Sequence, residues 1–377
     1  MKKKILIAPN SFKECSDSVT VSEYLLEELY DRNDFNLILK PVSDGGDGFL
    51  RVCQKNFNLE IISYKVSSPY DESKINCEIG YDKTNKILYI ESANVLGLKI
   101  IPLSKRNPLK LSSKGMGELL IKILKDHNNG MRKVKKIIIG IGGTGTNDLG
   151  LGLFSKFNLK ILDAPGNSLE IVPSNFVNAR KLFWSKVILP FKIEIITDVD
   201  NELLGENGAT SIFGRQKGLS LKQILFVEKG FQNIVNLIKN NKLIDLPNKL
   251  SGAGGGLAAG LQIFFNAKVI SSKKFIMNEL KIKKIKNVNY VITGEGAFDK
   301  QSLMEKATGS LVQHFIKMNI PVIICCGVYD RQVAKIFRNS IEFIELQKFF
   351  RNKFESIKYF RRGIKLASDE IKRKIIK

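Results

Sequence analysis

Short apolar runs alternate with amphipathic segments along most of the chain, and this alternation restricts the fold more than any other feature. Ile5-Leu6-Ile7-Ala8, Ile137-Ile138-Ile139 and Val322-Ile323-Ile324 are too short for helices and are typical of buried strands. Apolar residues at helical spacing follow the first run at 18–30 and recur at 220–240. The pattern predicts an α/β fold.

The same pattern gives expected boundaries for the elements. Strands are expected at 4–8, 36–40, 61–66, 75–80, 86–91, 137–139, 193–197, 290–292 and 322–324. Helices are expected at 18–30, 114–127, 220–240 and 257–262. Another helix is expected to begin near Asn147-Asp148, and the residues at 350–377 are expected to form a solvated basic helix. Ser112 or Ser113 is expected to cap the helix that begins at Lys114. Many of the strands end in glycine-rich or acidic loops, and ligands of open α/β sheets bind at that edge.

Length and charge restrict the class of protein. A chain of 377 residues divides more readily into two domains than into one core. Lys and Arg total 60 against 37 for Asp and Glu, a formal charge of +23. This excess could mark a nucleic-acid partner. The lysines are scattered in small groups, however, which favours a solvated surface that attracts anionic substrates and argues against nucleic acid.

The cysteines and the N-terminus bear on the compartment. An odd number of cysteines, five, and the lack of a C-x-x-C pair argue against a disulfide framework or a zinc site. The apolar run that follows Lys4 stops at Pro9, which is too short for a secretion signal. No stretch is long and apolar enough to span a membrane. We therefore expect a cytoplasmic protein with no membrane partner.

Residues 142–148 carry the strongest local signal for a ligand. Their sequence is Gly142-Gly143-Thr144-Gly145-Thr146-Asn147-Asp148. Glycines let backbone N–H groups approach an anion, the next helix would offer its N-terminus, and the two threonines add hydroxyl groups. A tight strand-to-helix turn with a capping aspartate explains the pattern equally well. No G-x-x-x-x-G-K-[ST] segment occurs in the chain, so a P-loop is not supported.

A second glycine-rich segment precedes the helix expected at 257–262. It contains Gly252, Gly254 and Gly255. These glycines could hold a phosphate, or they could simply permit close helix packing. Two such loops in one chain would suit a nucleotide with several phosphates.

Asp198 and Asp200 follow a buried strand directly. Carboxylates one residue apart on a strand point to the same face, where they repel unless a cation lies between them. Oxygen ligands of this kind suit Mg²⁺, alone or with one carboxylate serving as a base. Solvated loop carboxylates are the alternative interpretation.

Two further loops combine glycine with carboxylates. Asp44 and Asp47 flank Gly45 and Gly46, and they could cap a helix, hold Mg²⁺ or bind substrate hydroxyls. The other loop carries Gly294, Glu295, Gly296 and Asp299 after a strand, the position of a general base.

Lysines complete the set of candidates. Lys13, in Ser11-Phe12-Lys13 after the first strand, and Lys217 could bind a phosphate or a carboxylate, or could be ordinary surface lysines. His127 and His314 have no partner motif and are expected to be structural.

Taken in order, these segments resemble the type-1 glycerate kinase family. The resemblance rests on Ala8-Pro9-Asn10-Ser11-Phe12-Lys13, Asp44-Gly45-Gly46-Asp47-Gly48, Glu91-Ser92-Ala93, Arg106-Asn107-Pro108-Leu109, Gly117-Glu118-Leu119, Gly142 to Asp148, Asp198-Val199-Asp200-Asn201, Gln216-Lys217-Gly218, Gly252-Ala253-Gly254 and Thr293-Gly294-Glu295-Gly296. Each motif is short, but the ordered set is specific and extends from about residue 4 to residue 330.

The resemblance implies phosphorylation of D-glycerate to a phosphoglycerate with ATP and Mg²⁺. It also implies a discontinuous Rossmann-like α/β domain, which we assign to 1–68 and 287–377, with a second α/β domain at 69–286 inserted into it. The substrate is then expected in the cleft between the two domains.

Residue roles within this set are hypotheses. We expect Asp198 or Asp200 to accept the proton of the attacking hydroxyl, while its partner or Asp44 holds Mg²⁺. Lys13 and Lys217 are expected to bind the carboxylate of glycerate or the phosphates. The loops at 142–147 and 252–256 are expected to cradle phosphates.

The chain also departs from the family pattern. Glu202 and Arg215 stand where the family usually has proline, and Ala297 replaces a basic residue. These changes keep open an alternative, a degenerate non-catalytic homologue that binds glycerate or nucleotide. A nucleic-acid-binding protein is the other class, motivated by the charge alone.

Overall fold

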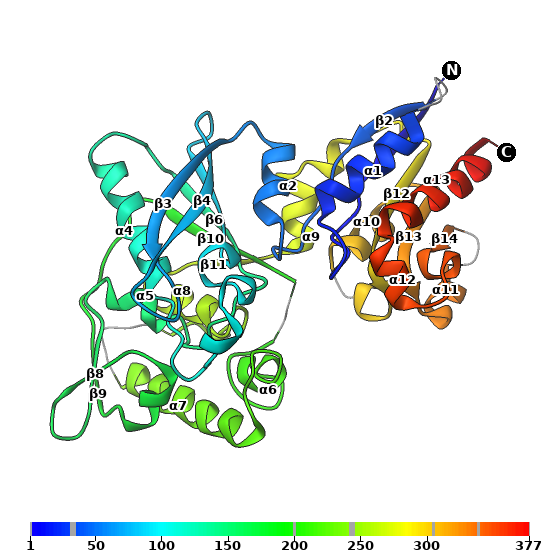
Figure 1. Ribbon diagram of the computed structural model, residues 1–377. Coiled ribbons are helices and arrows are strands. Elements are labelled where there is room, and N and C mark those ends of the chain that lie inside the picture. The colour runs from blue at the N-terminus through cyan, green and yellow to red at the C-terminus, as the bar shows by residue number, and fades with distance from the viewer. Residues whose placement is uncertain are drawn as a thin grey trace. The chain divides into compact units, whose positions relative to one another are not determined.

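The chain forms two compact units in the computed structural model (Figure 1). Residues 2–30, 35–198, 201–240, 246–303, 306–337 and 340–376 are described. Unit 1 comprises residues 1–58 and 271–377, and unit 2 comprises residues 59–270. The fold is therefore α/β, with one unit inserted into a discontinuous, Rossmann-like one, as expected.

The division falls earlier in the chain than the expected junctions at 68/69 and 286/287. Strand β3 (Glu60–Ser67) belongs to unit 2 because it pairs along its whole length with β4 (Lys74–Asp82). The π-helical turn η4 (Phe275–Glu279) belongs to unit 1, where the ring of Phe275 lies 5.4 Å from that of Phe49.

Unit 1 is built on a parallel sheet with the strand order β14-β13-β12-β1-β2. The strands are β1 (Lys3–Ile7), β2 (Phe35–Leu39), β12 (Tyr290–Phe298), β13 (Val322–Tyr329) and β14 (Ile341–Glu345). The first strand of the chain thus lies between β2 and β12, a strand from its last third, with Ile5 opposite Tyr290. Ile5, Ile7, Ile292 and Ile323 pack with α1 (Ser18–Tyr30) and α13 (Phe360–Ile376) in one buried core.

Shorter helices complete unit 1. They are α2 (Phe49–Asn56), α9 (Ser272–Lys274), η5 (Ile282–Lys284), η6 (Gln301–Leu303), α10 (Ala307–Ile316), α11 (Arg331–Ile336), η7 (Leu346–Phe349) and α12 (Lys353–Lys358). Parallel pairing places the carboxyl ends of β1, β12 and β13 at one edge of the sheet, from which several of these helices begin.

Unit 2 has a mixed sheet with the strand order β11-β10-β6-β5-β4-β3. The central strands β5 (Ile87–Glu91), β6 (Lys136–Gly140) and β10 (Lys192–Thr197) are parallel, whereas β3, β4 and β5 form an antiparallel meander. The edge strand is β11 (Lys268–Ser271), and a second small sheet has the order β8-β7-β9, with β7 (Lys160–Leu162), β8 (Ser168–Leu169) and β9 (Lys181–Phe183).

The helices of unit 2 cover a single large apolar core. They are α3 (Ala93–Leu96), η1 (Leu98–Ile100), η2 (Leu103–Lys105), α4 (Lys114–Asn128), α5 (Leu151–Ser155), η3 (Pro173–Asn178), α6 (Ala209–Phe213), α7 (Leu221–Lys239) and α8 (Leu257–Phe265). Helix α7 begins with a capping box between Ser220 and Gln223, which satisfies two backbone N–H groups of its first turn. No helix in the described ranges is long and apolar enough to cross a membrane.

Many expected elements are confirmed, including α1 at 18–30 and the start of α4 at Lys114, but one helix start and one helix cap differ. The helix expected near Asn147-Asp148 begins at Leu151, because Leu149 and Gly150 take left-handed backbone conformations that delay it. Ser113 stands at the N-cap of α4, yet its hydroxyl donates to Asp148 instead of capping the helix.

Two expectations near the C-terminus were also wrong. Thr293–Gly296 is not a loop after a strand, because β12 continues through it and pairs with β13 as far as Phe298. The last helix is not merely solvated: Phe360, Ile364, Ala367, Ile371 and Ile375 of α13 recur at helical spacing and are buried in the core of unit 1.

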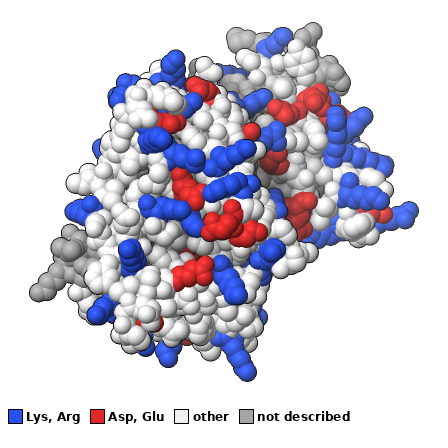
Figure 2. Space-filling view, turned by 60° about the vertical axis from the view of Figure 1, so that its left-hand side comes forward, with Lys and Arg blue, Asp and Glu red and all other residues white. Residues whose placement is uncertain are grey.

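The excess of positive charge is spread over the surface. Figure 2 shows Lys and Arg side chains distributed over one face, with Asp and Glu side chains between them. Several lysines form ion pairs that are partly exposed, such as Lys114 with Glu72 at 2.8 Å and Lys74 with Glu118 at 3.0 Å. Such pairs contribute little to stability individually, so the charge mainly serves solvation.

Candidate functional site

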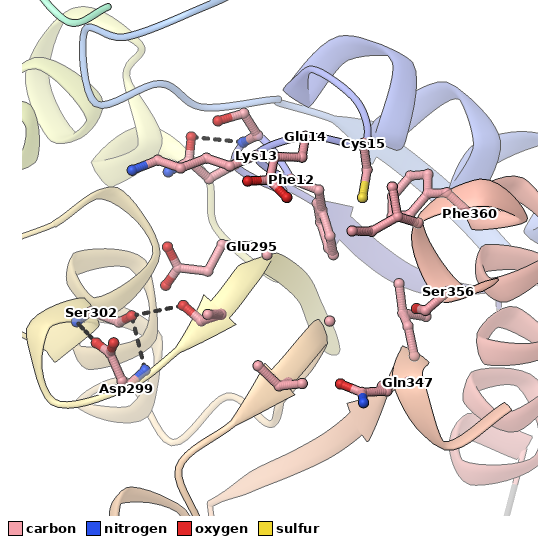
Figure 3. A pocket seen from close by; sticks show the side chains of 18 of the residues that line it. Phe12, Lys13, Glu14, Cys15, Glu295, Asp299, Ser302, Gln347, Ser356 and Phe360 are labelled. Carbon is pink, nitrogen blue, oxygen red and sulfur yellow. Dashed lines mark hydrogen bonds between the residues drawn. The ribbon is translucent and has the colours of Figure 1, made fainter. Parts of the chain in front are cut away.

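A pocket of about 390 Å³ opens at the carboxyl ends of β1, β12 and β13 in unit 1 (Figure 3). Its walls come from the turn after β1, from the loop that holds Asp44, from the end of β12 and from the segment that joins η7 to α13. The pocket therefore lies at the sheet edge where ligands of open α/β sheets bind.

This pocket collects residues that are far apart in the sequence. Six predicted site residues line it: Ser11, Lys13, Asp44, Glu295, Gly296 and Asp299. The other predicted residues of unit 1, Gly45, Gly46, Asp47 and Gly294, do not line it. The pocket thus unites three motifs that the sequence could only place in order.

Glu295 has the most unusual environment in the pocket. Its Oε1 atom is shielded from solvent and has no hydrogen-bond partner among the described residues, a costly state for a carboxylate oxygen. Burial raises the pKa of Glu295 to about 7, and the Asp44 and Asp299 carboxylates add to this, whereas Ser302 and Lys306 oppose it. Glu295 can therefore hold or release a proton near neutral pH.

The other carboxylates around Glu295 are better satisfied. Asp44 accepts a hydrogen bond from the backbone N–H of Gly46 at 3.0 Å through Oδ1. Asp299 accepts from the N–H groups of Gln301 and Ser302 at 2.8 and 3.1 Å, so it fixes the first turn of η6. Asp299 therefore shapes the pocket wall as a local cap.

Two glycines permit the close approach of β12 and β13 beneath the pocket. A Cβ atom on Gly294 would lie 1.7 Å from the carbonyl oxygen of Cys325, and one on Gly327 would lie 2.4 Å from that of Gly296. No side chain can be accommodated at either position without moving a backbone. Gly294 thus has a packing role that needs no ligand.

Sequence reasoning missed the far wall of the pocket. Phe12, Leu346, Gln347, Ser356 and Phe360 line it, and Figure 3 shows Gln347, Ser356 and Phe360 on the side opposite Glu295, Asp299 and Ser302. The spacing of apolar residues along α13 was the signal that could have predicted a buried Phe360.

In unit 2, Lys217 joins the two glycine-rich loops. It is only 6% exposed, and its ammonium donates to the carbonyl oxygen of Thr146 at 2.6 Å. A Cβ atom on Gly255 would lie 2.2 Å from that same oxygen and 2.6 Å from Nζ of Lys217. Burial lowers the pKa of Lys217 to about 7, and the nearby Asp148 opposes this shift. Lys217 is thus enclosed between the loops.

Asp148 anchors the loop from within. It is completely buried, and its carboxylate accepts hydrogen bonds from the N–H and the hydroxyl of Ser113, both at 2.7 Å, and from the N–H groups of Gly150 and Gly152, both at 3.2 Å. Burial raises the pKa of Asp148, whereas these hydrogen bonds lower it. The carboxylate therefore ties α4 to the start of α5.

Some of the other polar side chains in this loop have hydrogen-bond partners, and others do not. The Thr144 hydroxyl lies 2.8 Å from the carbonyl oxygen of Ile141 and 2.9 Å from the Ser92 hydroxyl. The Thr146 hydroxyl and Oδ1 of Asn147 are buried and have no partner in the part of the chain that the structure describes, although Nδ2 of Asn147 donates to Thr210 at 3.1 Å. Gly142 is partly exposed and Gly143 is exposed.

The other two predicted site glycines of unit 2, Gly252 and Gly254, are explained by close packing. A Cβ atom on Gly252 would lie 2.2 Å from the carbonyl oxygen of Glu202, and one on Gly254 would lie 2.8 Å from the side chain of Ile141. Asp198 follows β10, as expected. Asp200 lies outside the described residues, so the shared face expected for this pair is not defined.

Both histidines have surroundings without a catalytic partner in the described ranges. Nδ1 of His127 accepts the N–H of Val134 at 3.0 Å, which stabilises the turn between α4 and β6. His314 lies on α10 with its ring edge-on to Phe315, and burial lowers its pKa.

Comparison with known proteins decides the family. The model of the glycerate kinase family matches residues 5–375. The chain belongs to the glycerate kinase family. The expected resemblance is confirmed, and so is the expectation of an enzyme of this family, a phosphotransferase.

Members of the family agree in extent as well as in sequence. The chain is 32% identical to a glycerate kinase of Neisseria meningitidis serogroup B, over 86% of this chain and 85% of that protein. It is 31% identical to a glycerate 2-kinase of Escherichia coli K12, over 90% and 89%. A crystal structure from Salmonella typhimurium LT2, assigned as glycerate kinase 2, matches the fold over both whole chains with a TM-score of 0.75 at 24% identity.

Proposed function

We propose that this protein transfers the γ-phosphoryl group of ATP to D-glycerate with the help of Mg²⁺. The observation that carries the proposal is the pocket of unit 1, which gathers Ser11, Lys13, Asp44 and Glu295 from three family motifs. A pocket that offers both cations and carboxylates suits an anionic acceptor, a phosphate chain and a metal ion together.

The carboxylates are compatible with Mg²⁺. No group of three or more His, Cys, Asp or Glu residues in the described ranges could hold a metal ion by itself. Mg²⁺ is commonly bound by one or two carboxylates plus water and substrate phosphates, so Asp44 fits as one ligand, with Asp198 and Asp200 as further candidates. When bound, the ion would neutralise charge on the phosphates.

The chain's own residues then position and deprotonate the acceptor. Lys13, exposed at the mouth of the pocket, binds the carboxylate of glycerate or a phosphate oxygen. Asp198 or Asp200 is one candidate to accept the proton of the attacking hydroxyl. Glu295 is a second, because its unpartnered oxygen and a pKa of about 7 match the needs of a base at neutral pH.

One departure from the family pattern has a partial replacement in the pocket. Ala297 lines the pocket where the family usually carries a basic residue, and Lys306 lines the same pocket at the N-cap of α10. A phosphate beside Lys306 would also meet the N-terminus of that helix. This arrangement favours an active enzyme over a degenerate homologue that only binds glycerate or nucleotide.

Steady-state turnover tests the proposal. Purified protein with ATP, Mg²⁺ and D-glycerate should release ADP in a coupled assay, and NMR of the product should identify the phosphorylated hydroxyl. L-glycerate and glycerol are the controls for the acceptor. Binding of glycerate or ADP without any turnover would support the degenerate homologue instead.

A further inference from the structure

The pocket of unit 1 is larger than its acceptor requires. Cavities of roughly 300–1,000 Å³ hold drug-sized ligands, and this one measures about 390 Å³. A three-carbon acid fills only a small part of such a space. The remaining volume is large enough for a second ligand that is bigger than the acid.

The pocket has two chemically distinct ends. The polar end contains Lys13, Asp44, Glu295, Asp299, Ser302 and Lys306. The apolar end is formed by Phe12, Val328, Leu346, Ile357 and Phe360, with the rings of Phe12 and Phe360 5.1 Å apart. Figure 3 shows Phe360, Gln347 and Ser356 across the pocket from Glu295 and Ser302. Glycerate has no apolar surface that could profit from the apolar end.

Two polar side chains at the apolar end remain unused. In the part of the chain that the structure describes, neither the amide of Gln347 nor the hydroxyl of Ser356 has a side-chain hydrogen bond, although both line the pocket. A glutamine amide offers a donor and an acceptor side by side. That pair matches adenine, which presents a donor at N6 next to a ring-nitrogen acceptor, whereas guanine presents two acceptors there, O6 and N7.

We infer that the apolar end of this pocket binds the adenine of ATP, with Gln347 reading the edge of the base and the phosphate chain running toward Lys13 and Lys306. The inference rests on the proposed kinase function and adds the location of the nucleotide and the residue that selects adenine. It places the nucleoside entirely in unit 1, against η7, α12 and the start of α13.

The arrangement also explains the composition of the far wall. Leu346 and Phe360 are buried in the core of unit 1, so they offer a rigid apolar surface. Val328 and Ile357 are more exposed and can cover the faces of a planar ring. Small-molecule sites commonly combine buried apolar residues at the base with partly exposed apolar residues at the sides.

Gln347→Ala tests the inference through substrate selection. The KM for ATP should rise about tenfold, and the preference for ATP over GTP should shrink by a similar factor, because a bidentate contact to a base is worth about 1–3 kcal/mol. The KM for D-glycerate should change less than about twofold. Gln332→Ala, an exposed glutamine at the start of α11 outside the pocket, is the matched control and should change neither constant.

A second variant, together with a direct measurement of ADP binding, tests the location of adenine independently of the kinetic constants. Val328→Phe narrows the apolar end without touching its polar groups, and calorimetric titration with ADP should show at least about tenfold weaker binding. Circular dichroism melting confirms that both variants fold.

The outcomes separate the inference from the function it rests on. An unchanged KM for ATP with a raised KM for glycerate in Gln347→Ala would overturn the inference and assign this end to the acid. If the wild-type protein binds ADP but shows no turnover, calorimetry on the same variants still decides: weaker ADP binding supports the location of adenine while the proposed kinase activity fails.

Discussion

Glu295 of unit 1 and Lys217 of unit 2 are both ionisable side chains shielded beside glycine-rich segments, but they face opposite surroundings. Glu295 of unit 1 lies at the wall of an open pocket, and one of its oxygens has no partner within the described ranges. Lys217 of unit 2 donates to Thr146 and is covered by Gly255. The Glu295 carboxylate can therefore still accept a hydrogen bond from a ligand, whereas the Lys217 ammonium is already bound to a backbone oxygen. Similar sequence signals, a charged residue near glycines, can therefore mark a reactive site or a structural one.

The sharpest test of this contrast is Glu295→Gln. The amide keeps the size of the side chain but cannot accept a proton at neutral pH, so we expect kcat to fall about 100- to 1,000-fold, measured as ADP release with saturating substrates. Glu14→Gln is the matched control, since Glu14 lines the same pocket but is exposed; it should retain at least half of the turnover. Near-full activity in Glu295→Gln would shift the role of proton acceptor to Asp198 or Asp200.

Gly255→Ala probes the closed arrangement of unit 2. A Cβ atom would strike the carbonyl oxygen of Thr146 and Nζ of Lys217 at a φ of +67°, so we expect unfolding to become easier by about 3 kcal/mol. Fluorescence of Trp184, the single tryptophan, reports on this unit during denaturant unfolding. Gly130→Ala has a similar φ of +76° but open space around it, and it should cost about 1 kcal/mol. Equal losses in the two variants would contradict the close packing.

Lys217→Met asks whether the lysine touches substrate. Because its ammonium points to Thr146 and is shielded from solvent, we expect the KM values for ATP and D-glycerate to change less than about threefold. A residue that bound a phosphate directly would lose far more, since charge-assisted hydrogen bonds contribute about 1.5–3 kcal/mol. Lys13→Met is the contrasting variant from the open pocket and should raise a KM about tenfold or more.

The pH dependence of stability should have opposite signs for the two groups. Lys217 has a pKa of about 7 in the folded chain against 10.5 when exposed, so the unfolded chain binds the extra proton between these values. Stability of unit 2, followed by Trp184, should rise with pH across that window, by at most about 1.4 kcal/mol per pH unit. The slope should be smaller in Lys217→Met.

Glu295 should make the stability of unit 1 depend on pH in the acidic to neutral range. Its pKa is about 7 in the folded chain against 4.5 when exposed, so the folded chain binds the extra proton and stability should fall as pH rises from about 4.5 to 7. Cys325 and Cys326 are buried on the neighbouring strand β13, with Cys326 opposite Glu295, and their labelling by a thiol reagent in mild denaturant measures this stability without added metal. The same slope in Glu295→Gln would exclude Glu295 as its source.

Local patterns in the sequence were enough to predict much of the secondary structure. The spacing of apolar residues placed α1 at 18–30 and α7 near 220–240, because that spacing agrees with the final packing. The start of α5 could not be predicted, since Leu149 takes a left-handed conformation that only tertiary contacts enforce. The continuation of β12 through Gly294 and Gly296 depends on pairing with β13, a long-range contact that a local pattern does not contain.

The site was predictable only where motifs are short and continuous. Ser11, Lys13, Asp44 and Glu295 were found, because strand ends in α/β sheets attract such residues. Gln347 and Phe360 were missed, because the family resemblance weakens before them and their position depends on how α13 packs against α1. The insertion of unit 2 came from the resemblance, since apolar periodicity carries no information about which strands are neighbours.

The pairing of Ile5 with Tyr290 has a consequence for biosynthesis. A ribosome releases β1 and α1 long before the strand that must lie beside them, and it releases all of residues 59–270 in the interval. The inserted unit can complete its own sheet during that time, while the opening segment waits with one edge unpaired. Translation that stops early would therefore yield a folded insert attached to an unstructured leader, without the pocket of unit 1.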